Sequence, residues 1–145
     1  MKVFLNLLIL AGFGWTVLAG GAEWETDFEK AKALSQKEGR IILLNFSGSD
    51  WCGWCKRLEK EVFSKAEFSS FADKELVLVK VDFPRFKEMD QAQTRANRGL
   101  ADKYGVSGFP TILLVDANEK VLMRTGYMPG GPKAYVDHLK NQLKL

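Results

Sequence analysis

The chain contains two cysteines, and both lie in the tetrapeptide Cys52-Gly53-Trp54-Cys55. Disulfide exchange needs one reachable thiolate and a second thiol close enough to resolve the mixed disulfide that the first one forms. Cysteines three residues apart on a helix face the same side. If a helix begins at Cys52, its unpaired backbone N–H groups and its dipole favour the thiolate form of that side chain. We therefore expect Cys52 to be the exposed nucleophile and Cys55 the shielded resolving thiol.

The residues inside the motif suit a site that meets other proteins. Gly53 lets a partner backbone approach closely, and Trp54 is expected at the rim, where its ring can rest on a substrate. Three other interpretations are open. A structural disulfide across four residues would contribute only about 2 kcal/mol, against about 4.7 kcal/mol for a long loop. A closed zinc site needs four ligands, and the only histidine is His138. Coincidence is disfavoured because the motif follows a buried strand. We expect no metal and no organic cofactor.

The segments around the motif predict how it is held. The apolar run 41–46 is typical of a strand buried on both faces, and residues 47–50 form a loop before the helix that the cysteines begin. Leu58, Val62 and Phe63 mark the inward side of that helix. Upstream, Thr26 followed by Glu29 is a capping-box pattern for a helix that ends at Gly39.

The rest of the chain alternates strands with helices. The patterns predict a short helix over 64–74, a buried strand over 76–81, a charged loop and helix over 84–105, a strand over 111–115, a turn over 116–120, a returning strand over 121–124 and a last helix with Pro132 at its first position. This order indicates one α/β domain: a mixed central sheet with helices on both faces and a C-terminal hairpin and helix. The charged stretch with Arg95 and Arg98 is interpreted as a solvated helix face, with a docking patch as the alternative.

The N-terminus has the pattern of a secretory signal peptide. A positive start is followed by an apolar stretch and then by small residues, so residues 1–22 are assigned to the signal, with cleavage after Ala19 or Ala22, and residues 23–145 to the domain. An uncleaved membrane anchor is the alternative, although the apolar run is short for a span of about 20 residues. We expect an exported protein, periplasmic or extracellular. The formal net charge of +3 is too small for a nucleic-acid-binding protein.

The sequence resembles the thioredoxin-like family. The resemblance rests on Trp51 and the two cysteines after a hydrophobic strand, and on the run Gly108 to Thr111 before a later strand. It covers residues 24–145 and implies the thioredoxin-like fold. It also implies that Pro110 is in the cis form and faces the cysteines, with Phe109 and Trp51 at the substrate-binding surface.

The sequence is most similar to small exported bacterial thioredoxin-like proteins and to the periplasmic domain of transmembrane thiol:disulfide interchange reductases. The phrase over residues 50–64 carries this similarity. In that group a glutamate four residues after the second cysteine lies near the active site, and Glu59 matches it; the alternative is a solvated helix-surface acid.

The sequence also departs from the family pattern. Where thioredoxins carry a buried aspartate in the strand before the motif, the nearest residue is Asn45, which cannot take up a proton. Gly-Trp replaces Gly-Pro between the cysteines, and the histidine of strongly oxidising relatives is absent.

Together these observations predict an exported thiol–disulfide oxidoreductase that reduces or exchanges disulfides in exported proteins. The resemblance implies a membrane thiol reductase as electron donor. We expect a monomer, since no dimerisation segment is visible. The alternatives are a redox-inactive binding module with a structural disulfide, and a disulfide isomerase or oxidase.

Overall fold

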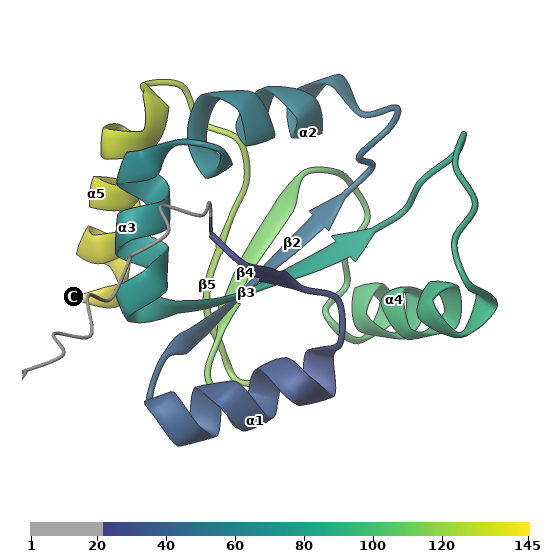
Figure 1. Ribbon diagram of the computed structural model, residues 1–145, viewed down its shortest axis with the longest axis horizontal. Coiled ribbons are helices and arrows are strands. Elements are labelled where there is room, and N and C mark those ends of the chain that lie inside the picture. The colour runs from purple at the N-terminus through teal and green to yellow at the C-terminus, as the bar shows by residue number, and fades with distance from the viewer. Residues whose placement is uncertain (1–21) are drawn as a thin grey trace, which may run out of the picture.

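The computed structural model describes residues 22–145, and the predicted signal peptide lies outside these residues except for Ala22. A five-stranded sheet runs through the centre of this part (Figure 1). Its strands lie in the order β1-β3-β2-β4-β5. Their bounds are Trp24–Glu25, Ile41–Ser47, Leu76–Asp82, Thr111–Val115 and Val121–Thr125, for β1 to β5 in turn. The strands β1, β2 and β3 are parallel, whereas β4 is antiparallel to both β2 and β5. The predicted mixed sheet is confirmed.

Helices cover both faces of the sheet, as the alternation of elements predicts (Figure 1). One face packs against α1 and α4. The other face packs against α2, the π-helical turn η1 that continues it, α3 and α5. The bounds of these helices are α1 Phe28–Glu38, α2 Gly53–Leu58, η1 Glu59–Phe63, α3 Ala66–Glu75, α4 Gln91–Lys103 and α5 Gly131–Leu143. In residues 22–145, no helix is long and apolar enough to cross a membrane.

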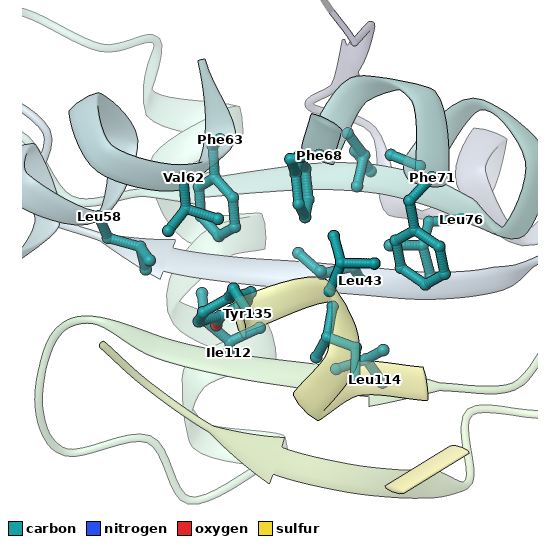
Figure 2. Packing of buried hydrophobic residues seen from close by; sticks show 14 of the residues in the cluster. Leu43, Leu58, Val62, Phe63, Phe68, Phe71, Leu76, Ile112, Leu114 and Tyr135 are labelled. Carbon is teal, nitrogen blue, oxygen red and sulfur yellow. The ribbon is translucent and has the colours of Figure 1, made fainter. Parts of the chain in front are cut away.

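A dense apolar cluster holds the segment α2–η1 on the sheet (Figure 2). The inward residues predicted for this helix, Leu58, Val62 and Phe63, are all buried in it. The Phe63 ring lies 4.8 Å from that of Phe68 and 5.9 Å from that of Tyr135, between centroids. Burial of a side chain of this size contributes about 1.5–3 kcal/mol to folding. These residues therefore hold the helix that follows the first cysteine firmly against the sheet.

Three local predictions need correction. The N-cap of α1 is Asp27, not Thr26, because the Asp27 carboxylate accepts the N–H groups of the next turn directly. The strand β1 was not predicted, since two residues that pair through their backbone with β3 leave no hydrophobic period. Pro132 takes the second position of α5, because Gly131 begins that helix.

Candidate active site

Cys52 ends the loop between β2 and α2, and Cys55 lies in α2. Figure 1 shows that loop running from the end of β2 to the start of α2. Cys52 is the N-cap of α2, as expected, and Cys55 follows in the first turn. The two are joined by a disulfide, with their Cα atoms 5.3 Å apart. The Cys55 N–H donates to Cys52 Sγ over 3.2 Å. The sulfur of Cys52 therefore accepts a hydrogen bond from a backbone N–H in the first turn of α2, at the positive end of the helix dipole. This arrangement favours a thiolate.

The expected difference in exposure between the cysteines is wrong for this disulfide form. Cys52 is 6% exposed and Cys55 5%, so both are buried. The reason is that the Cys52 sulfur turns back over the first turn of α2, where it is bonded to Cys55. The distinction between the two sulfurs thus rests on their place in the helix, one at its cap and one inside it.

The predicted residues Trp51, Phe109 and Pro110 come from the turn before Cys52 and from the segment that leads into β4. The Trp51 indole N–H donates to the Phe83 carbonyl over 2.7 Å. Its ring meets the Phe109 ring edge-on, with centroids 6.0 Å apart, and Phe109 stacks on Phe83 at 5.0 Å. The Phe109–Pro110 peptide bond is cis. Contacts among these three aromatic residues thus link the turn before Cys52 to the segment after β3 and to the segment before β4.

Trp54 lies on the surface, with 55% of its area exposed, as expected for a residue at the rim. Its ring centroid is 5.1 Å from that of Tyr127, and the Arg57 guanidinium lies 5.5 Å and 5.4 Å from the two rings. Glu61 accepts hydrogen bonds from Arg57 and from the Tyr127 hydroxyl. These two bonds hold the pKa of Glu61 below its usual range, so the carboxylate stays charged and holds Arg57 and Tyr127 beside the Trp54 ring.

Glu59 lies at the junction of α2 and η1, with its side chain exposed. It lines a cavity of about 190 Å³ that Cys55 and Lys80 also line. Lys80 sits on β3 in register with Asn45 on β2, and the buried Asn45 Oδ1 atom has no hydrogen-bond partner. A polar cavity with room for several water molecules thus connects the second cysteine with the Glu59 carboxylate and with three lysines, Lys56, Lys60 and Lys80.

Two aspartates anchor the loop that leads to Cys52. Asp82, buried at the end of β3, accepts the Ser49 N–H over 2.9 Å and the Ser49 hydroxyl over 2.6 Å. Burial opposes the charge, but hydrogen bonds from Ser49 and Lys87 outweigh it and hold the pKa of Asp82 below its usual range. Asp50 accepts three backbone N–H groups from residues 85–87. Both carboxylates hold the loop in place.

Several of these residues were not predicted from the sequence: Lys80, Asp82, Phe83, Arg85, Glu61 and Tyr127. The sequence carried one signal that could have identified two of them, Lys80 and Asp82: each is a charged residue within or just after an apolar strand. A charge that is buried at such a place needs a partner, which indicates a site nearby.

In residues 22–145, no group of three or more histidine, cysteine, aspartate or glutamate residues is placed to hold a metal ion. The His138 ring, which could have supplied a metal ligand, is hydrogen-bonded to the Thr125 hydroxyl, with 3.1 Å between Nε2 and the oxygen.

The chain matches a family model described as a thioredoxin-like domain, over residues 28–141. It is 38% identical to the disulfide bond reductase DsbH of Chlamydia pneumoniae over 129 residues, which cover 89% of this chain and 77% of the relative. It is 32% identical to the thiol:disulfide interchange protein DsbD of Cronobacter sakazakii over 116 residues. That match covers 78% of this chain and only 18% of DsbD, so the chain corresponds to a small part of that relative.

Solved structures show the same likeness. A DsbH oxidoreductase superposes with a TM-score of 0.83 and 38% identity, over 87% of both chains. The oxidised C-terminal domain of DsbD from Neisseria meningitidis superposes with a TM-score of 0.55 over 84% of this chain and 99% of that domain. At 18% identity the second match concerns the fold alone.

Proposed function

Since the chain belongs to the thioredoxin-like family and is a thiol–disulfide oxidoreductase with Cys52 and Cys55 as its redox pair, we propose that it reduces or exchanges disulfides in exported proteins. The observation that carries this proposal is the position of Cys52 at the N-cap of α2, with the Cys55 N–H 3.2 Å from its sulfur. The similar DsbH protein is named a disulfide bond reductase, which supports the direction of electron flow.

The reaction consumes the dithiol form of the pair. The Cys52 thiolate attacks one sulfur of the substrate disulfide, forms a mixed disulfide and expels the other substrate sulfur as a thiolate. The Cys55 thiolate then attacks Cys52 Sγ, which closes the Cys52–Cys55 disulfide and releases the second substrate thiol. The substrate gains two electrons and the pair loses two, so an outside donor must reduce the pair again. By resemblance that donor is a membrane thiol reductase.

Glu59 is the group we assign to the proton of Cys55. The resolving step needs a Cys55 thiolate in a buried place, where desolvation disfavours charge. Glu59 and Lys80 line the cavity that reaches Cys55, and this cavity has room for a water molecule that can carry the proton. Asn45, the residue nearest to the position of the buried acid of thioredoxins, cannot take up a proton, so we assign this role to a carboxylate on the helix instead of the strand.

The remaining predicted residues form the surface that a substrate meets. Gly53 and Trp54 lie beside Cys52 and are exposed, and Phe109 and Pro110 lie next to Trp51. Pro110 has no backbone N–H, so its neighbours' backbone groups stay free to pair with an extended substrate segment, as in strand addition.

The reduction potential of the Cys52–Cys55 pair tests the reductase assignment. Gly53 and Trp54 place no charge beside a Cys52 thiolate, so the reduced form is not unusually favoured. Equilibration with glutathione should give a potential below about −180 mV. A potential near about −120 mV would instead identify an oxidase.

Export is tested separately, by fractionating cells that express the full chain and determining the N-terminus of the mature protein. We expect it in the exported fraction, beginning at Gly20 or Glu23, the residues that follow the two cleavage sites. A protein that keeps Met1 and stays with the membrane would identify the apolar segment as an anchor.

A further inference from the structure

The loop between β3 and α4 is held against the turn that leads to Cys52. The Asp50 carboxylate accepts the N–H groups of Arg85, Phe86 and Lys87 over 3.0, 2.8 and 3.0 Å. Asp50 is two residues from Cys52, so the residue that clamps the loop belongs to the same turn as the nucleophile. Three hydrogen bonds from consecutive residues leave this stretch of backbone little freedom.

The side chains on either side of Phe86 are exposed, but each contacts a group of the protein. The Arg85 guanidinium lies 3.6 Å from the centre of the Trp51 ring, and the Lys87 ammonium lies 3.2 Å from Asp82 Oδ2. Phe86 itself points away, with 82% of its area exposed. An aromatic side chain on a mobile loop can fold back onto apolar surface. The Phe86 ring stays exposed because hydrogen bonds to Asp50 fix the backbone that carries it.

Phe86 follows a residue that packs on the aromatic side chains before Cys52. Arg85 packs on Trp51, and Trp51 packs in turn on Phe109, the residue before Pro110. A rigid exposed aromatic loses little conformational freedom on binding, and residues of this kind contribute most to protein interfaces. Arg85 and Lys87 each have a partner but are themselves exposed, so the loop presents the Phe86 ring between two cationic side chains.

We propose that Phe86 is a docking residue that binds an apolar side chain close to the disulfide of a protein substrate. The inference rests on the proposed function and narrows its substrate class. Folded proteins bury most of their large apolar side chains, so a site that selects one beside a disulfide selects incompletely folded chains. The loop then acts as a specificity element, and the chemistry stays with Cys52 and Cys55.

The test compares two disulfide peptides that differ at one position beside the cysteine, Leu in one and Ser in the other. We expect the wild type to have a KM about tenfold lower for the Leu peptide. Phe86→Ala should remove this preference. The matched control is Leu122→Ala, which truncates a 41% exposed apolar residue on β5 and should keep the preference.

A second variant tests the clamp itself. Asp50→Ala keeps the Phe86 ring but releases the backbone that presents it, so it should also lose the preference, and the double variant should lose no more than either single one. Equal KM values for the two peptides in the wild type, or an undiminished preference in Phe86→Ala, would overturn this inference alone. A wild type that reduces neither peptide would overturn the proposed function, and this inference with it.

Discussion

Replacing Asp82 by alanine removes the carboxylate that anchors the loop before Cys52. In the structure Asp82 is buried and accepts two hydrogen bonds from Ser49, over 2.9 and 2.6 Å. A hydrogen bond to a charged group contributes about 1.5–3 kcal/mol. At the lower end of that range the two bonds correspond to about 3 kcal/mol of unfolding free energy, or a fall in Tm of about 10 °C for a domain of this size.

The loss should depend on pH, because hydrogen bonds from Ser49 and Lys87 overcome the effect of burial and hold the pKa of Asp82 below its usual value. A carboxyl group with a lowered pKa stabilises the fold above its unfolded pKa of about 3.9, and this contribution is lost as the pH falls through the folded pKa. The stability gap between wild type and Asp82→Ala should therefore be constant around neutral pH and narrow below about pH 4.

Urea unfolding at pH 7 and at pH 3 measures this gap. Asp73→Ala is the matched control, since it removes an exposed carboxylate from α3 and should change the unfolding free energy by less than about 0.5 kcal/mol. The reasoning fails if Asp82→Ala is as stable as the wild type at pH 7, or if the gap has the same size at both pH values.

Three further substitutions test other parts of the site. Glu59→Gln should slow disulfide reduction by about 10²-fold at neutral pH, whereas the control Glu67→Gln on α3 should leave the rate unchanged. If the pH–rate profile of Glu59→Gln matched that of the wild type, Glu59 would be a surface acid with no part in the reaction. Pro110→Ala adds a backbone N–H donor just before β4 and gives the unfolded chain more freedom, so insulin reduction and Tm should both fall. Unchanged values of both would argue against a role for Pro110. In Gly48→Ala the new Cβ meets the Trp51 indole, so stability should fall by about 1–3 kcal/mol with a shift in tryptophan fluorescence; a wild-type spectrum and Tm would contradict this packing.

The elements that position the disulfide were predictable because their signals are local. A continuous apolar run identified the strand over 41–46, and helical spacing identified Leu58, Val62 and Phe63 as the buried side of the next helix. That Pro110 faces the cysteines is implied only by the family resemblance, since these residues lie far apart in the sequence and no local pattern links them.

The surroundings of the site could not be predicted, because they depend on contacts between distant residues. Asp50 binds the Phe86 N–H across 36 positions, and Glu61 binds Tyr127 across 66. No periodicity or spacing rule links such residues. The predicted exposure of Cys52 was wrong for a related reason: the argument placed its backbone at the helix start, but the direction of the sulfur depends on the bond to Cys55.

The most direct test of the account is to trap the mixed disulfide with single cysteine variants. Cys55→Ser keeps the thiol at the helix cap but removes the resolving thiol, so it should accumulate mixed disulfides with exported proteins, visible as bands on non-reducing gels that disappear on reduction. Cys52→Ser should trap almost nothing and have no reductase activity. If Cys52→Ser trapped the partners instead, the roles of the two sulfurs would be reversed, and if neither variant did, the pair would be a structural disulfide.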